Sequence, residues 1–316
     1  MSWFARSKRA SFSKSLQRLH AALRLVGHRL KSTPSILSLS VIAIAVLSSV
    51  LVHPAQALLA KVSPTSPQLG DTITVTMQAD GSGAAPQVRV GAKTYPAFSL
   101  NANLYRTLVP TTPLDKPGPL TVQVNNGTDT QAFKLNLKKR WFPTQSIWLR
   151  PGSDSNSDEY EFDRMDAFKA IVTPQKYWNG PFRKPNNGPV TTVYGVRRYY
   201  NGVFAKDYFH RGVDYAGAYG SAIVAPADGR VALVGREAKR FKVHGNCVGL
   251  DHGQGVSSVY LHLSRIDVKE GDFVKAGQTI GALGGTGAVT GPHLHWGLFV
   301  FGKSVDPGPW RNQGFN

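Results

Sequence analysis

The chain is poor in cysteine. Cys247 is the only cysteine among 316 residues, so no internal disulfide can stabilise a fold, and stability has to come from a buried core or a bound metal. No cysteine lies near the apolar segment Ile36 to Val52, which excludes a lipoprotein anchor there. With 41% apolar residues, the chain is nevertheless long enough to bury one or two cores.

Acidic residues are missing from the N-terminal region, where Asp71 is the first of them. Eight Lys and Arg precede the uncharged stretch Ile36 to Val52, and Ala55-Gln56-Ala57 follows it as a small-x-small sequence. This order predicts a cleaved signal peptide over residues 1–57. An uncleaved membrane anchor is the alternative, because the basic region is long and 17 residues can just span a bilayer. In both cases we expect export, to the periplasm, the cell envelope or the extracellular space.

Basic residues exceed acidic residues, giving a formal net charge of +18, of which eight units belong to residues 1–57 and +10 to the rest. An exported basic protein suits an anionic partner such as a cell-wall polymer or lipid headgroups. The basic residues are scattered, and no DNA-reading or RNA-reading motif accompanies them, so we expect no nucleic-acid partner.

Residues 58–138 contain no histidine and few acidic residues, which favours a binding or spacer module over a catalytic one. Apolar and polar residues alternate in Thr72 to Met77 and in Leu120 to Val124, and turn residues separate such runs. This pattern predicts a small β-sandwich, and Val62-Ser63-Pro64 with Gly70-Asp71 resembles immunoglobulin-like modules. Residues 139–189 are predicted to form a connector, with a helix from Asp158 to Val172 that ends before Pro174.

Residues 190–316 consist of strand-like runs and glycine-rich turns without a helical period. They predict a mostly antiparallel β-domain of the barrel-sandwich type, so the expected fold class of the protein is all-β. Two similar stretches, residues 224–231 and 268–281, predict hairpins. Because such hairpins also occur in lipoyl and biotinyl carriers, a carrier or adaptor domain is one alternative, but no lysine-bearing carrier turn is present.

All histidines after residue 57 lie between residues 210 and 295. His210 and Asp214 are four residues apart, and His293 and His295 are two apart, so on strands each pair would share one face. Nitrogen and carboxylate donors suit Zn²⁺, and three protein ligands leave a position for water, as is typical of a catalytic site.

The order and spacing of these residues resemble the lysostaphin/LytM-type zinc endopeptidases of bacterial cell-wall metabolism. The similarity runs from about residue 193 to 307, through Tyr194-Gly195-Val196-Arg197-Arg198, the His210 to Asp214 motif, Gly245-Asn246, Asp251-His252-Gly253, Tyr260-Leu261-His262-Leu263-Ser264, Gly284-Gly285-Thr286-Gly287 and Thr290-Gly291-Pro292-His293-Leu294-His295-Trp296. It implies a duplicated hybrid motif fold, with His210, Asp214 and His295 as ligands of one Zn²⁺. It also implies that His262 and His293 orient or deprotonate the water that attacks the peptide carbonyl. The same two histidines would stabilise the oxyanion formed by this attack and protonate the leaving amine. The implied substrate is the peptide cross-links of peptidoglycan.

Other interpretations of these residues stay open at this point. His262 could be an ordinary strand histidine, and the whole domain could be a catalytically silent protein that binds the wall or regulates an amidase. We expect His244 and His252 to be structural turn residues, Trp296 to be a core residue or the wall of a groove, and Cys247 to be a buried, inert thiol.

Overall fold

The computed structural model describes residues 58–79, 85–127, 129–148 and 158–315. The predicted signal segment, residues 1–57, lies outside them. Most of the regular structure is β-strand, and all but one of the strand pairings given below are antiparallel, which confirms the all-β class. No helix in this part of the chain has the length and apolar composition needed to cross a bilayer.

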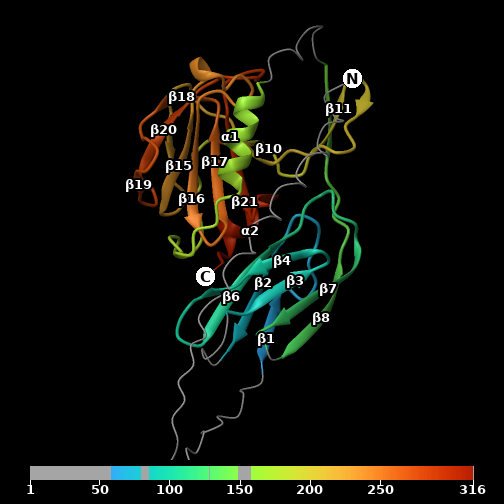
Figure 1. The fold of residues 1–316 in the computed structure, drawn as a ribbon. Coiled ribbons are helices and arrows are strands. Elements are labelled where there is room, and N and C mark those ends of the chain that lie inside the picture. Colours follow the sequence, from blue (N-terminus) through green and yellow to red (C-terminus); the bar gives the residue numbers. More distant parts are fainter. Residues whose placement is uncertain (1–57, 80–84, 128, 149–157, 316) are drawn as a thin grey trace, which may run out of the picture. The chain divides into compact units, whose positions relative to one another are not determined.

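Two four-stranded sheets occupy the N-terminal part (Figure 1). One has the order β1 (Leu59–Ser63), β2 (Thr72–Gln78), β6 (Leu104–Pro110), β5 (Phe98–Ser99), and the other β4 (Lys93–Pro96), β3 (Gln87–Val90), β7 (Gly118–Asn125), β8 (Thr130–Leu137). Their inward-facing residues share one buried cluster, with Ile73 and Val75 from β2 and Val122 and Val124 from β7. The period-two alternation in the sequence thus places one apolar face of each sheet against the other.

The C-terminal part is built around an eight-stranded sheet. Its strands, in spatial order, are β10 (Val190–Thr192), β13 (Gly212–Tyr215), β21 (Leu294–Val300), β17 (Val256–Leu261), β16 (Cys247–Gly253), β15 (Gly229–Gly235) and β19 (Phe273–Val274), with β22 (Lys303–Val305) also paired to β21. A three-stranded sheet, β14 (Ala222–Val224), β20 (Thr279–Leu283) and β18 (Leu263–Ile266), lies beside it. A second three-stranded sheet joins β12 (Val203–Phe204), β11 (Arg197–Tyr200) and β9 (Thr144–Ile147), of which β9 and β11 are parallel.

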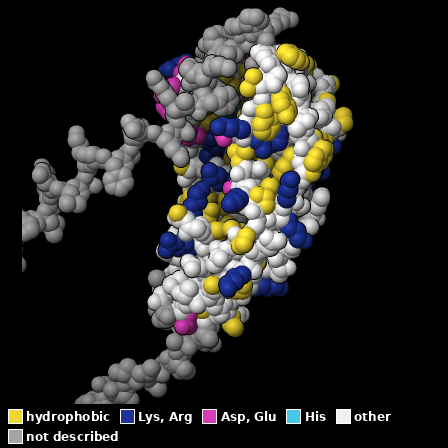
Figure 2. Space-filling view, turned by 90° about the vertical axis from the view of Figure 1, so that its right-hand side faces the viewer, with side chains coloured by type: hydrophobic (Ala, Val, Ile, Leu, Met, Phe, Trp, Pro, Cys, Tyr) yellow, Lys and Arg dark blue, Asp and Glu magenta, His cyan; other side chains and the backbone are white. Residues whose placement is uncertain are grey.

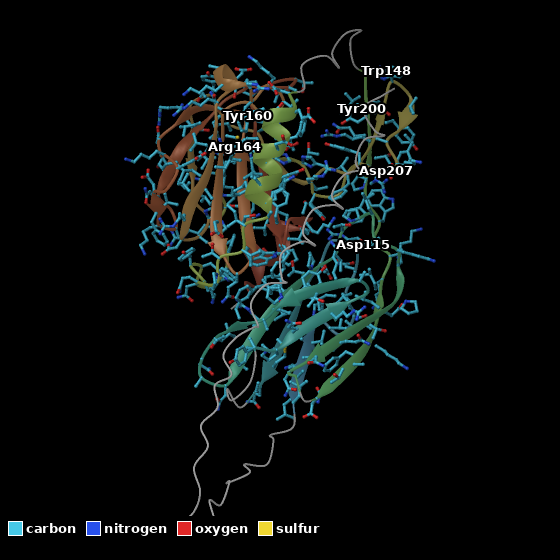
Figure 3. All side chains as sticks on the ribbon, viewed as in Figure 1. Asp115, Trp148, Tyr160, Arg164, Tyr200 and Asp207 are labelled. Carbon is cyan, nitrogen blue, oxygen red and sulfur yellow. The ribbon has the colours of Figure 1, made fainter. Side chains whose placement is uncertain are left out.

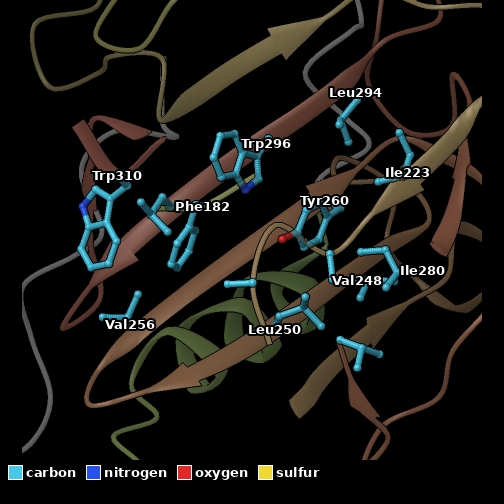
Figure 4. Packing of buried hydrophobic residues seen from close by; sticks show 14 of the residues in the cluster. Phe182, Ile223, Val248, Leu250, Val256, Tyr260, Ile280, Leu294, Trp296 and Trp310 are labelled. Carbon is cyan, nitrogen blue, oxygen red and sulfur yellow. The ribbon is translucent and has the colours of Figure 1, made fainter. Parts of the chain in front are cut away.

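The core of this part lies on one face of the large sheet, where Trp296, Tyr260, Leu250 and Ile280 pack together (Figure 4). Trp296 is fully buried, as predicted. Helix α1 (Glu159–Lys169) covers the other face beside β15 (Figure 1). Because both faces are covered, every residue of β16 and β17 is buried.

Helix α1 confirms the helix predicted from Asp158, which is its N-cap and accepts a hydrogen bond from the Tyr160 N–H. The prediction that residues 190–316 contain no helix was wrong for one short element, α2 (Pro307–Asn312). This helix follows the N-cap Asp306 and begins with proline. A 3₁₀ turn, η2 (Glu237–Lys239), is the other departure. Such short elements form because of their caps and turn residues, and they are too short to show a period.

The two predicted hairpins, residues 224–231 and 268–281, are also wrong. Strand β14 pairs with β20, and β15 pairs with β19, so each stretch crosses from one sheet to the other and the two stretches pair together. Asp228 joins them, since its carboxylate accepts from the Ala276 N–H and from Lys275 Nζ, both at 2.8 Å. The sequence pattern located the turns, but it does not encode which strand lies beside which.

Buried contacts also connect the N-terminal sheets with the C-terminal part. Phe301, in the turn between β21 and β22, packs against Tyr95 with ring centroids 5.4 Å apart. Arg106 of β6 is buried and donates to the Gln254 side chain at 2.7 Å and to the Phe315 carbonyl at 2.9 Å. An aromatic ring and a buried cation of the N-terminal sheets therefore contact residues of the C-terminal part directly.

Candidate metal centre

Strand register brings two of the predicted ligands together. In the antiparallel pair of β13 and β21, Asp214 lies opposite His295, and on the other edge of β21 His295 lies opposite Leu261. Directly opposed residues have their Cβ atoms only about 5 Å apart. Asp214 and His295 therefore meet because of this register, although 80 residues separate them in the chain.

His210 reaches the same point from a loop. Strand β13 begins at Gly212, so the prediction that His210 and Asp214 share one strand was wrong for His210. The loop is anchored to the backbone on both sides of the histidine, because the His210 N–H donates to the Val196 carbonyl and the His210 carbonyl accepts from the Gly195 N–H. The ring is buried, and these two bonds fix the backbone that carries it.

Three donor atoms converge at this point. His210 Nε2 lies 3.0 Å from Asp214 Oδ1 and 3.0 Å from His295 Nδ1, and His295 Nδ1 lies 2.9 Å from the same carboxylate oxygen. These three residues form a group whose ligand atoms all lie within 4.8 Å of one another. Hydrogen bonds alone do not account for two imidazole nitrogens and a carboxylate oxygen facing a single point.

The donor set fits zinc. With Zn–N bonds near 2.1 Å, the ligand atoms of a tetrahedral site lie about 3.4 Å apart, close to the spacing found here. His210 Nδ1 is 2.9 Å from the Val193 carbonyl, which can only accept, so Nδ1 carries the proton and the lone pair of Nε2 points to the other donors. Gly212 leaves the space for this approach, because a Cβ there would lie 2.8 Å from His295 Nε2 and 2.3 Å from the Trp296 carbonyl oxygen.

The protonation states favour a cation at this position. Burial would raise the pKa of Asp214, but its close contacts with the His210 and His295 rings lower it overall, so the carboxylate is charged. Burial lowers the pKa of His295 to about 4, so its imidazole is neutral near pH 7. A neutral imidazole and a charged carboxylate are the forms that bind a metal ion.

The two histidines predicted to be catalytic border the same point. The rings of His262 and His293 have centroids 4.9 Å apart, and His293 Nε2 lies 4.0 Å from Asp214 Oδ1. Each ring is oriented by a backbone carbonyl, since His262 Nδ1 lies 2.9 Å from the Thr286 oxygen and His293 Nδ1 lies 2.9 Å from the Gly291 oxygen. Both Nε2 atoms are thereby left to accept a proton and, once protonated, to donate it.

His262 lies at a bend between β17 and β18 rather than within a strand, with φ of 67°. Non-glycine residues seldom adopt this left-handed conformation, and such strain is concentrated at functional sites. Burial, followed by the neighbouring His295 and His293, lowers the pKa of His262 to about 3. Near pH 7 its ring is therefore neutral.

The other two histidines of the described residues, His244 and His252, have partners other than the three donor atoms. His252 is buried inside β16 rather than in a turn, and its ring contacts the Asp228 carbonyl and Ser258 Oγ, each at 2.8 Å. His244 contacts a buried carboxylate of α1, with Nδ1 3.0 Å from Glu161 Oε2. Cys247 is buried, as predicted, and burial raises the pKa of its thiol to about 12.

Glu161 was not recognised from the sequence. It is completely buried, and its carboxylate also accepts from the Val243 and His244 N–H groups at 3.0 to 3.2 Å. The His244 carbonyl in turn accepts from the His262 N–H. Helix α1 thus holds the loop that supports His262. The sequence signal would have been a single acidic residue on the apolar face of the predicted helix, which is weak evidence by itself.

Replacing Glu161 with alanine is expected to lower the free energy of unfolding by about 3–5 kcal/mol, because it leaves buried N–H groups and His244 without a partner. Urea denaturation of the purified protein measures this loss. Asp163→Ala, an exposed change on the same helix, serves as the matched control and should shift stability by less than about 0.5 kcal/mol. Equal effects of the two changes would contradict the role given to Glu161.

Comparisons with known proteins identify the family of the domain that contains this site. Residues 208–307 match the model of peptidase family M23. Over 98 residues the chain is 46% identical to the peptidoglycan DD-endopeptidase ShyC of Vibrio cholerae, an alignment that covers 31% of this chain and 22% of that protein. Over 135 residues it is 35% identical to the murein hydrolase activator NlpD of Escherichia coli, covering 43% of this chain and 31% of that protein.

A solved structure is similar over a longer range. It is a Pseudomonas aeruginosa protein assigned to peptidase M23, with a TM-score of 0.59 and 27% identity, and the similarity covers 79% of this chain and 96% of that one. The curated relatives are matched over only part of their length, 20% to 22% for the first of them. The matched range contains His210, Asp214, His262, His293 and His295, together with strands β13 and β21. Residues 208–307 of this chain therefore form a domain of peptidase family M23.

Proposed function

We propose that this protein is a zinc-dependent endopeptidase that hydrolyses peptide cross-links of bacterial peptidoglycan. The observation that carries the proposal is the convergence of His210, Asp214 and His295 on one point, with His262 and His293 beside it. A structural zinc site usually has four protein ligands, whereas three ligands bordered by two further histidines are typical of a hydrolytic site.

The residues of the chain have separable tasks in this reaction. His210, Asp214 and His295 hold the zinc ion, which when bound polarises the peptide carbonyl and acidifies a water molecule. His262 is neutral near pH 7, and its Nε2 can accept the proton of the attacking water. His293, whose ring is fixed by the Gly291 carbonyl, is placed to stabilise the oxyanion and to return a proton to the leaving amine.

The substrate and the compartment are supported by the relatives and by the sequence. ShyC is named a peptidoglycan DD-endopeptidase, and NlpD a murein hydrolase activator, so both names refer to the cell wall. The charge of +10 outside residues 1–57 suits an anionic wall polymer. We infer that the protein is exported by its N-terminal segment and acts in the cell envelope, with contact to the membrane only if that segment is not cleaved.

The proposed activity is tested by incubating the zinc-loaded protein with purified peptidoglycan and analysing the released fragments by mass spectrometry. We expect fragments that differ from the intact cross-linked material by one added water per cleaved peptide bond. Removing zinc with a chelator should reduce the rate by about a thousandfold or more, and adding zinc back should restore it. Unchanged fragmentation after verified zinc removal would contradict a metal-dependent reaction.

A catalytically silent regulator is the second candidate, and the similarity to NlpD favours it. Retention of all five site residues argues against it, because a protein that acts only by binding does not need a zinc-ligand set. The two candidates are separated by the same incubation carried out with and without a cell-wall amidase. A regulator releases fragments only when the amidase is present, whereas the proposed peptidase releases them alone.

A further inference from the structure

Arg198 of β11 is a half-buried cation close to the candidate metal centre. Its Nε lies 3.2 Å from Gln145 Oε1, and its Nη1 donates to the hydroxyls of Tyr200 and Tyr208 at 3.3 and 3.0 Å. Gln145 comes from β9, and Figure 3 shows Tyr200 on the part of the fold where β9 and β11 pair. Three neutral groups therefore hold the guanidinium in one position.

No carboxylate among the described residues forms a salt bridge with Arg198. Burial would lower its pKa, but Tyr208, Tyr200 and Asp214 raise it overall, so the guanidinium is charged. The bonds given above use Nε and Nη1, which leaves the Nη2 edge for another acceptor. A buried or half-buried guanidinium is normally paired with an anion, so this one lacks its usual partner.

The strand that carries Arg198, β11, begins one residue after Val196, which contacts the loop of His210. Val196, two residues earlier, accepts the hydrogen bond of the His210 N–H, and the charge of Asp214 acts on the Arg198 guanidinium. Tyr208 links the two regions, because both Arg198 and Arg211 lie over its ring, at 5.4 and 5.3 Å from the centroid. Arg198 is therefore placed beside the zinc-binding residues rather than on a distant surface.

The neighbouring Arg197 has a different set of partners. Arg197 donates to the Tyr208 carbonyl at 2.9 Å and to the Lys206 carbonyl at 2.6 Å, which closes the loop before His210. On the side of β11 that Figure 2 shows, Lys and Arg side chains are scattered among hydrophobic and other side chains, and few Asp and Glu side chains are visible. A peptide strand that carries negative charge would be attracted to this side of the metal centre.

We propose that Arg198 binds a free carboxylate of the substrate peptide, on a residue adjoining the scissile bond. The proposal rests on the peptidase function proposed above, and it adds a substrate feature that the metal centre does not define. An Nη2–H and carboxylate bond would be charge-assisted and shielded in part from water, which makes it stronger than a neutral hydrogen bond. The guanidinium would select peptides with a free α-carboxylate over their amidated forms.

The test compares two forms of one substrate, a purified cross-linked muropeptide dimer and the same dimer with its carboxylates converted to carboxamides. Zinc-loaded wild-type protein should prefer the carboxylate form by roughly 10- to 100-fold in kcat/KM. Arg198→Gln should lose most of that preference, with little change for the carboxamide form and unchanged zinc content. Lys206→Gln is the matched control, because it removes an exposed charge near the same loop and should keep the preference.

Calorimetry, which measures the binding of both dimers to the same proteins, distinguishes the carboxylate-site proposal from the peptidase proposal. Preference for the carboxylate dimer in binding, lost in Arg198→Gln, supports the carboxylate site even if nothing is hydrolysed, in which case the peptidase proposal fails. Hydrolysis of both dimers at equal rates by the wild-type protein overturns the carboxylate site and leaves the peptidase intact. Equal losses for both dimers in Arg198→Gln would also overturn it, because they indicate a structural role.

Discussion

His295→Ala is expected to abolish zinc binding and hydrolysis together. The substitution removes Nδ1, which lies within 3.0 Å of both His210 Nε2 and Asp214 Oδ1, and leaves two donors where three converge. Two ligands do not hold Zn²⁺ against solvent competition, and loss of the metal removes several kcal/mol of transition-state stabilisation, or about a thousandfold or more in rate. Metal analysis by mass spectrometry and digestion of purified peptidoglycan measure the two losses.

The matched control for this experiment is His252→Ala. His252 is completely buried, and it contacts Asp228 and Ser258 rather than the donor atoms. It should therefore lower stability while keeping one zinc per chain. If His295→Ala retained zinc and still digested peptidoglycan, the proposed ligand set would be incorrect.

His293→Ala is expected to separate metal binding from catalysis. His293 Nε2 lies 4.0 Å from Asp214 Oδ1, outside the group of atoms in closest contact, so the variant should keep its zinc. Loss of a group that transfers protons or stabilises the oxyanion reduces turnover by roughly 10²- to 10⁴-fold. Rate measurements on zinc-saturated protein check the size of this effect.

His262→Ala should behave in the same way, which makes it a companion to His293→Ala. A zinc loss in His293→Ala as complete as in His295→Ala would mean that the division between ligand and catalytic histidines is wrong. A zinc-saturated variant with full turnover would instead exclude His293 from the reaction.

The spacing of histidines and carboxylates in the sequence was informative about the candidate site. His-x-His places His293 and His295 on one side because side chains alternate along an extended chain, and both rings do border Asp214. Their meeting with His210 could not be derived from local pattern, since His210 lies in a loop. That proximity depends on the register of β13 with β21. The assignment of ligand and catalytic roles came from family resemblance and stays a prediction.

The fold was predictable at the level of strands and less so at the level of pairing. Alternation located β2 and β7, and the cap at Asp158 located α1. Two features could not be predicted in this way: the crossing of residues 224–231 and 268–281 between the sheets, and the parallel pairing of β9 with β11. Both depend on contacts between residues far apart in the sequence, which a short stretch of sequence does not contain. Glu161 and Arg198 could not be recognised from the sequence for the same reason, because their importance depends on the residues that surround them in the folded protein.

The pairing of strand β21 on both of its edges limits where insertions and deletions can occur in related sequences. It pairs with β13 on one edge and β17 on the other, and a shift of one residue would replace His295 by buried Trp296 opposite Asp214. Such a shift would turn every side chain of the strand to the opposite face. Insertions and deletions should therefore be excluded from β13, β17 and β21 and confined to the loops between them. Length variation among relatives would then change the loops around the metal centre while the metal centre stays fixed.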